Sequence, residues 1–182
     1  MTDQTPSAKT KYDGVAMTLH WLMALSILVA LILGPGMEDM APELRRETLA
    51  GHSFNGLFAL TLAIVRLWWR RKNPPPAYPD TMADWQVKAA KGVTHGFYFL
   101  FFYMPIVGLA HAITYQDTVV EPLQLFNLSV APSAITQVFH VMHAIGMVLF
   151  MILVLVHIGA AIKHFVIDKD KVLQRMLPFT KV

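Results

Sequence analysis

The chain has 182 residues, of which 55% are hydrophobic and 15% are charged, and its mean hydropathy is +0.47. Soluble domains carry about 25% charged residues, so this composition argues against an ordinary soluble protein and indicates one that lies in a membrane. The chain contains no cysteine, which excludes disulfides, thiolate-held iron–sulfur clusters and the covalent haem attachment of c-type cytochromes.

Four segments without Lys, Arg, Asp or Glu predict the fold. They cover residues 14–37, 48–65, 92–116 and 122–162. A bilayer core of ~30 Å requires about 20 apolar residues per helix, so each segment suits one membrane-spanning helix if the second extends to residue 69. The sequence therefore predicts an all-α membrane protein, a single domain of residues 1–182 that forms a four-transmembrane-helix bundle. The helices are expected over residues 15–34, 48–69, 91–115 and 134–167.

In chain order, the first helix is expected to end at residues 34–36, Gly-Pro-Gly, which do not form the small-residue cleavage site of a signal peptide. The second is expected to end at the basic residues 70–72, before three prolines that cannot continue a helix. A short amphipathic segment is expected at the membrane surface over residues 80–91. Pro105 is expected to kink the third helix, and the fourth is long enough to protrude from the membrane.

The polar segments between these helices differ in charge. Their net charges are +4 in residues 66–91 and +3 in residues 163–182, against −2 in residues 37–47 and −2 in residues 115–137. Because cytoplasmic loops carry the excess of Lys and Arg, we expect both termini to be cytoplasmic. This topology places 13 of the 15 basic residues on the cytoplasmic side. The pI near 9.2 then reflects the topology and is no argument for a nucleic-acid partner.

Four histidines fall at two depths of this bundle. His20 lies in the first turns of a helix that enters from the cytoplasm, and His52 lies near the outer end of a helix that enters from outside. His143 and His157 share the fourth helix at a spacing of fourteen residues, so they lie roughly 21 Å apart along its axis and on one face. The depth-matched pairs are His20 with His157 on the cytoplasmic side, and His52 with His143 on the outer side.

Two imidazoles at one depth, on different helices, can bind a haem iron from both sides. Ionisable groups inside a membrane are rare and by default indicate a functional site. A hydrogen bond to a neighbouring helix would explain any one of these histidines, but it does not explain why four of them pair by depth. The adjacent Gly51, Gly56, Gly146 and Gly159 would leave room for a flat macrocycle, although small residues also serve helix packing.

The other four histidines lie nearer the membrane surfaces. We expect His111 and His140, near the outer side, to form hydrogen bonds at the interface, although His140 could also compete with His143 for an iron. His95 and His164, near the cytoplasmic side, suit either a role at a quinone or in proton uptake, or an ordinary interfacial role.

An ordered set of motifs along the chain resembles the bacterial cytochrome b561 family. None of these motifs is specific by itself, but together they cover nearly the whole chain. They are Thr-Leu-His-Trp-Leu at 18–22, His52 with its glycines, Val-Arg-Leu at 65–67, Lys-Asn-Pro-Pro-Pro at 72–76, Pro-Ile-Val-Gly-Leu at 105–109, the His143 and His157 spacing, and Leu-Gln-Arg-Met-Leu-Pro at 173–178.

The resemblance implies a diheme b-type cytochrome of the bacterial inner membrane that exchanges electrons with quinone. The family's haem ligands carry over to His20, His52, His143 and His157, the same four residues that depth selects. The implied cofactors are two haem b groups, with ubiquinone as substrate or bound quinone. Arg66 would either pair with a haem propionate or extend to the membrane surface.

One characterised branch of the family oxidises superoxide on the periplasmic side and passes the electron to ubiquinone. Its quinone contacts lie at the cytoplasmic end, where His164 matches one of them by position and Lys88 or Lys91 would supply a basic partner. The resemblance thus implies a superoxide:ubiquinone oxidoreductase that works in the lipid bilayer as a monomer or homodimer.

The outer loops depart from what an anionic substrate favours. A basic surface would attract superoxide, yet both outer loops are net negative, and Arg45 and Arg46 are their only basic residues. These arginines could still form a local path for an anion. The overall charge instead suits a small periplasmic electron carrier that is basic or neutral.

Two other functions fit the same helices. A diheme anchor subunit would relay electrons from a hydrogenase or dehydrogenase complex to quinone, but the short outer loops leave little docking surface. A small haem-free transporter would be expected to carry Asp or Glu beside the histidines, and the four uncharged segments contain none.

Overall fold

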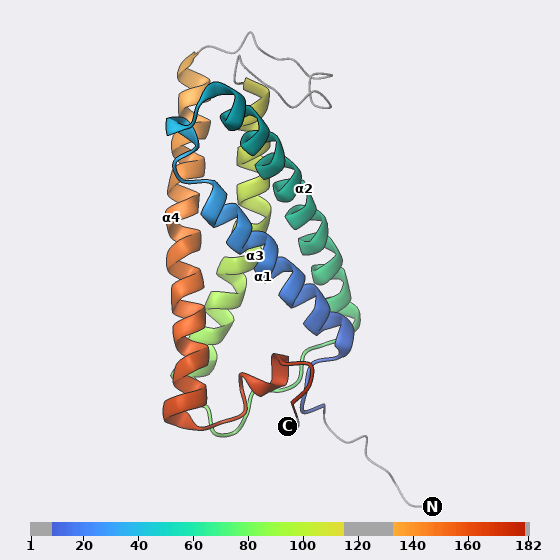
Figure 1. Cartoon of the computed structure of the whole chain (residues 1–182). Helices are drawn as coiled ribbons and strands as arrows, with labels where there is room; N and C mark the ends of the chain where they lie inside the picture. The colour runs from blue at the N-terminus through green and yellow to red at the C-terminus, as the bar shows by residue number, and fades with distance from the viewer. Residues whose placement is uncertain (1–8, 115–132, 181–182) are drawn as a thin grey trace, which may run out of the picture.

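The computed structural model describes residues 9–114 and 133–180, and this part of the chain is all helical. Four long helices form the bundle in Figure 1: α1 (Gly14–Leu33), α2 (Pro42–Lys72), α3 (Asp84–Thr114) and α4 (Ser133–Lys163). The shorter elements are η1 (Met37–Asp39), the π-helical turn η3 (His164–Asp168) and η4 (Gln174–Met176). Each long helix is long and apolar enough to cross a membrane, which confirms the predicted all-α class and the four spans.

Successive helices run in opposite directions along the bundle. α1 packs on α2, α2 on α3, and α3 on α4. The start of α1 and the end of α4 therefore lie at the same end, which we call the terminal end (Figure 1). The opposite end, where α1 leads into α2, is called the loop end. The expected loop of residues 116–133 falls almost entirely outside the described residues.

Two helices begin earlier than predicted. α2 begins at Pro42 instead of residue 48, because proline suits the first turn of a helix and Glu43 interacts favourably with its N-terminal dipole. α3 begins at Asp84, so most of the segment expected as a separate surface helix over residues 80–91 is continuous with α3. The Gln86 side chain accepts a hydrogen bond of 2.8 Å from the Ala83 N–H, which satisfies a free donor at that start.

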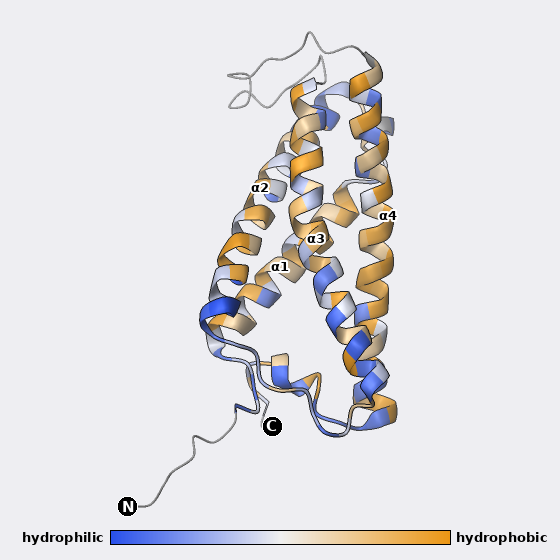
Figure 2. Cartoon of the chain, turned by 180° about the vertical axis from the view of Figure 1, so that it is seen from behind, coloured by the Kyte–Doolittle hydropathy of each residue, from blue (hydrophilic) through white to orange (hydrophobic). Residues whose placement is uncertain are grey.

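The outer surface of the bundle is apolar. Many large hydrophobic side chains are half exposed or more, for example Leu25, Phe58, Phe99 and Leu155. Figure 2 shows hydrophobic residues along most of the length of the helices and hydrophilic ones concentrated toward the terminal end. This distribution is the reverse of a soluble helical bundle and suits helices whose outer faces contact lipid.

Polar contacts and small residues join the helices inside the bundle. Ser26 of α1 donates from Oγ to Asn55 Oδ1 at 2.8 Å, and Asn55 of α2 donates from Nδ2 to the Ser26 carbonyl at 2.9 Å. The Tyr103 hydroxyl of α3 donates to the Met142 carbonyl of α4 at 3.0 Å. Beside it, a Cβ on Gly146 would lie 2.8 Å from Tyr103 Cε1, so this glycine allows α3 and α4 to approach closely.

We expect Asn55→Ala to destabilise the α1–α2 contact, because both reciprocal hydrogen bonds would be lost. Each hydrogen bond between membrane helices contributes about 1 kcal/mol, so the loss of two should lower the free energy of unfolding by roughly 1–2 kcal/mol. The midpoint of unfolding in sodium dodecyl sulfate, followed by tryptophan fluorescence, measures the change.

Thr61→Ala on the same helix is the matched control. Thr61 is exposed and donates only to the Leu57 carbonyl of its own helix at 2.9 Å. Equal unfolding midpoints for the two variants would contradict the assigned role of Asn55.

Candidate functional site

Two pairs of histidines face each other across the interior of the bundle. The ring centres of His20 on α1 and His157 on α4 are 6.0 Å apart, with an angle of 64° between the ring planes. The ring centres of His52 on α2 and His143 on α4 are 6.1 Å apart, at 75°. The structure thus brings together the same pairs that depth predicts, one pair near the terminal end and one near the loop end.

These separations suit a metal ion held between each pair of rings. Bonds from a metal to imidazole nitrogen are about 2 Å long, so two imidazoles on opposite sides of one metal have ring centres roughly 6 Å apart. Haem iron takes imidazole ligands at its two axial positions. The distances therefore fit a haem iron between His20 and His157, and a second between His52 and His143.

A large cavity beside the loop-end pair provides room for a cofactor. It has a volume of about 920 Å³ and is lined by His52 and His143, together with Gly56 and Gly108. Cofactor sites commonly have volumes of about 300–1,000 Å³. A Cβ added to Gly56 would have nothing within 4 Å, so this glycine leaves open space beside His52.

Gly108 brings α3 close to one of the paired histidines. A Cβ at this position would lie 3.0 Å from His143 Cε1, so only a glycine lets α3 approach the ring this closely. Gly51 and Gly159, like Gly56, have nothing within 4 Å of an added Cβ. Gly146, which was expected to clear space for a macrocycle, instead packs against Tyr103 and Met104.

A half-buried cation lies beside the terminal-end pair. Arg66 of α2 interacts electrostatically with both His20 and His157. Its Nη1 is buried and has no hydrogen-bond partner within the described residues. A buried N–H of a guanidinium requires a hydrogen-bond acceptor, and an anionic one binds most strongly, so a haem propionate would suit this position. This unpaired nitrogen is a second observation that fits a haem at the terminal-end pair.

Aromatic side chains surround the same pair. The ring centres of Phe97 and His157 are 5.3 Å apart and nearly perpendicular, at 87°. Trp21 contacts His20 with its ring centre at 5.3 Å. Phe97 also packs on Phe150, with ring centres 5.8 Å apart. These rings place apolar surface beside the pair, and the polarity around a haem is one property by which a protein adjusts its potential.

A third pair of histidines lies at the loop end. The ring centres of His111 on α3 and His140 on α4 are 5.4 Å apart, and both residues line the large cavity together with Arg45 and Asp39. His140, considered from the sequence as a competitor for the outer iron, is thus placed against His111, while His143 faces His52. The lining of the cavity at this end thus combines one Arg and one Asp with two histidines.

Of the residues considered for a quinone site at the terminal end, the structure buries one and leaves the others exposed. His164 is 7% exposed and its Nδ1 lies 2.6 Å from Asp170 Oδ2. Lys88, Lys91 and His95 are exposed on α3, and in the described part of the chain none of them makes a hydrogen bond with His164. The sequence did not indicate Asp170, because a single acidic residue in a terminal segment has no distinguishing pattern.

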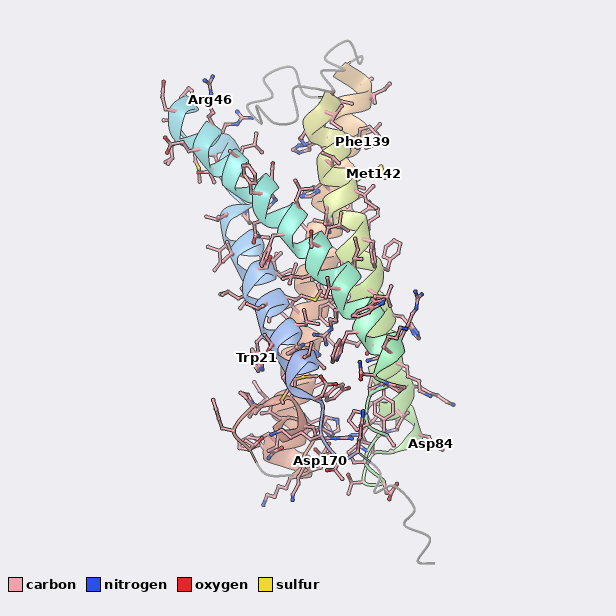
Figure 3. All side chains as sticks on the ribbon, turned by 90° about the vertical axis from the view of Figure 1, so that its right-hand side faces the viewer. Trp21, Arg46, Asp84, Phe139, Met142 and Asp170 are labelled. Carbon is pink, nitrogen blue, oxygen red and sulfur yellow. The ribbon has the colours of Figure 1, made fainter. Side chains whose placement is uncertain are left out.

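The last described residues of the chain fold back over the terminal end. Arg175 is 8% exposed, and it donates from Nε to the Thr10 carbonyl and from Nη2 to the Ala77 carbonyl, both at 2.7 Å. The indole of Trp21, next to His20, donates to the Met176 carbonyl at 3.0 Å. Figure 3 shows Trp21 near this end, with Asp170 in the segment beyond it and Arg46 at the opposite end. We call residues 174–180 the closing segment.

Comparisons with known proteins agree with this site. A model of the prokaryotic cytochrome b561 family matches residues 11–179. Cytochrome b561 homolog 2 of Escherichia coli (strain K12) is 26% identical over 92% of this chain and 91% of its own length. Cytochrome b561 homolog 1 of the same organism is 28% identical over 94% of this chain and 99% of its own length. Because the family model spans nearly all of the sequence, the chain belongs to the prokaryotic cytochrome b561 family, whose members are membrane electron-transfer proteins and for which a b-type haem is implied.

Proposed function

We propose that residues 1–182 form one domain that binds two haem b groups. His20 and His157 would hold one haem, and His52 and His143 the other. The ring separations of 6.0 Å and 6.1 Å support this proposal most directly. When bound, the two haems supply one-electron transfer across the bilayer.

The distribution of charge supports an orientation in the bacterial inner membrane with both termini in the cytoplasm. Residues 66–91 and 163–182, which adjoin the terminal end, carry net charges of +4 and +3. An excess of Lys and Arg is typical of cytoplasmic segments. The loop end, with the His52 and His143 pair, would then face the periplasm.

We infer that the protein exchanges electrons with the quinone pool near the terminal end. His164 would contact the quinone, and the exposed Lys91 would supply positive charge to the surrounding surface. Arg66 would pair with a propionate of the haem at the terminal-end pair, which satisfies its buried Nη1. Protons taken up on reduction of quinone would come from the cytoplasm.

We propose superoxide as the one-electron donor on the periplasmic side. Arg45, His111 and His140 line the cavity beside the loop-end pair together with Asp39, and the guanidinium and the imidazole N–H groups are donors to which a small anion could bind. A small periplasmic electron carrier is the second candidate, because the overall negative charge of the outer loops would attract a basic protein.

We expect His143→Ala to lose one haem and keep the other, because it removes a ligand of the loop-end pair only. His20→Ala should do the same for the terminal-end pair. The ratio of haem b to protein, from the pyridine haemochromogen spectrum, should fall from two to one in each variant.

His95→Ala is the matched control, since His95 is an exposed histidine of α3, and it should keep both haems. A wild-type protein without b-type absorbance would overturn the proposal, and a wild-type ratio of one would exclude the second haem.

Gly108→Val should weaken binding at the loop-end pair, because its Cβ would lie 3.0 Å from His143 Cε1. We expect less than the full complement of haem at this pair and a changed difference spectrum between the dithionite-reduced and oxidised forms. Gly92→Val on the same helix has nothing within 4 Å of an added Cβ, so it should keep the wild-type spectrum. If both variants keep it, Gly108 is not required for space at His143.

Superoxide should reduce the purified protein, and added ubiquinone-1 should reoxidise it. The haem absorbance follows both reactions, and superoxide dismutase should prevent the first. Reduction by a small reduced cytochrome but not by superoxide would identify the carrier as the donor. Failure of ubiquinone-1 to reoxidise the protein would contradict the role of quinone.

A further inference from the structure

The turn after α4 forms a buried histidine–aspartate pair. His164 Nδ1 lies 2.6 Å from Asp170 Oδ2, and the two residues are 7% and 8% exposed. Two backbone contacts hold Asp170 in this position. Its N–H donates to the His164 carbonyl at 3.1 Å, and its Oδ1 accepts from the Val172 N–H at 3.0 Å. The backbone of Asp170 is therefore tied to His164, and its carboxylate is held by the Val172 N–H at one oxygen while the other oxygen lies against the imidazole.

This contact defines which imidazole nitrogen carries a proton. An ionised carboxylate can only accept hydrogen bonds, so the proton between the two groups is on His164 Nδ1. The neutral ring is held in that tautomer, and Nε2 remains as the nitrogen that takes up and gives away a proton. The carboxylate also offsets the positive charge of the ring while both nitrogens carry protons, as in other histidine–aspartate pairs.

The other charged groups near His164 are already paired with each other. Asp168 Oδ2 lies 3.2 Å from His164 Nδ1. The Lys163 ammonium binds both oxygens of Asp168 at 2.8 and 2.6 Å, and the neutral Gln86 of α3 donates to Asp168 Oδ2 at 3.2 Å. The charge of Asp168 is thus offset by Lys163. Asp170 is the nearer of the two carboxylates to Nδ1, at 2.6 Å against 3.2 Å, and its side chain is the more deeply buried.

We propose that Asp170 is a positioning residue for proton transfer through His164 to quinone, which rests on the function proposed above. Reduction of quinone to quinol takes up two electrons, supplied by the donor at the loop end, and two protons, supplied by water at the terminal end. His164 passes a proton as its Nε2–H bond breaks and an O–H bond forms on the reduced quinone. Nε2 then takes the next proton from water, while Asp170 stays hydrogen-bonded to Nδ1.

The test measures how fast ubiquinone-1 reoxidises the dithionite-reduced holoprotein in a single turnover, as a function of pH. Asp170→Asn should slow the reaction at neutral pH by about tenfold or more, since proton transfer by a positioned side chain contributes about 10²–10⁴-fold. The pH profile of the rate should also differ from that of the wild-type protein, because the amide no longer holds Nδ1–H as the carboxylate does. The ubiquinone-1 concentration for half-maximal rate should stay at the wild-type value.

Three further variants separate the role of Asp170 from a structural one. Asp168→Asn is the comparison variant, and its rate should fall less than that of Asp170→Asn, because Asp168 lies farther from Nδ1, at 3.2 Å, and is more exposed. Asp170→Glu keeps a carboxylate and should restore most of the rate. His164→Gln should be slow at every pH. An Asp170→Asn protein with the wild-type rate and pH profile would overturn the proposal, as would one that changes only the half-maximal concentration.

A second measurement does not depend on a variant that folds. Nitrogen-15 NMR of histidine-labelled wild-type protein should show His164 as the Nδ1–H tautomer at neutral pH, and an Nε2–H tautomer would overturn the proposal. A wild-type protein that ubiquinone-1 does not reoxidise would refute the proposed role of quinone together with this inference. Normal reoxidation with an unaffected Asp170→Asn variant would refute the inference alone.

Discussion

The structure depends on one constraint, which is that imidazoles inside an apolar bundle need partners at their own depth. A polar group in hydrocarbon costs several kcal/mol when nothing satisfies it. α4 supplies one histidine at each of two depths, and α1 and α2 each supply the partner at one of them. The spacing between His143 and His157 therefore sets where α1 and α2 must lie along α4, and the packing of α3 then follows from the space beside the rings.

The two ends of the bundle differ in how open they are. At the loop end, a cavity of about 920 Å³ adjoins the His52 and His143 pair. At the terminal end, the closing segment is hydrogen-bonded to residues near the start of the chain through Arg175 and Trp21. A small molecule from water meets fewer barriers at the first end. The second end suits a lipid-soluble molecule that arrives between helices.

Much of this arrangement could be predicted from the sequence, because it depends only on where each residue lies along its membrane-spanning segment. Uncharged segments locate four spans, and the position of each histidine within its span gives its depth. The starts of α2 and α3 could not be found in this way, because hydropathy reports what contacts lipid and not where a helix begins. Pro42 and Asp84 begin their helices in polar segments, where local turn chemistry decides.

The polar contacts of the terminal end could not be predicted from the sequence either. Arg175 binds the carbonyls of Thr10 and Ala77, which are 165 and 98 residues away along the chain. No local pattern encodes such contacts, since they arise only after the bundle has brought distant loops together. The glycines show the same limit, because Gly108 and Gly146 look alike in sequence yet one faces His143 and the other Tyr103.

The position of both partner histidines on the last helix also governs how the protein is assembled. As the chain is synthesised, α1, α2 and α3 enter the membrane first, with His20 and His52 facing no imidazole. Neither pair exists until α4 has inserted, so the three-helix intermediate has no complete site of either kind. Insertion of the fourth helix completes both pairs in one event, and the closing segment, which is synthesised after α4, reaches its contacts only afterwards.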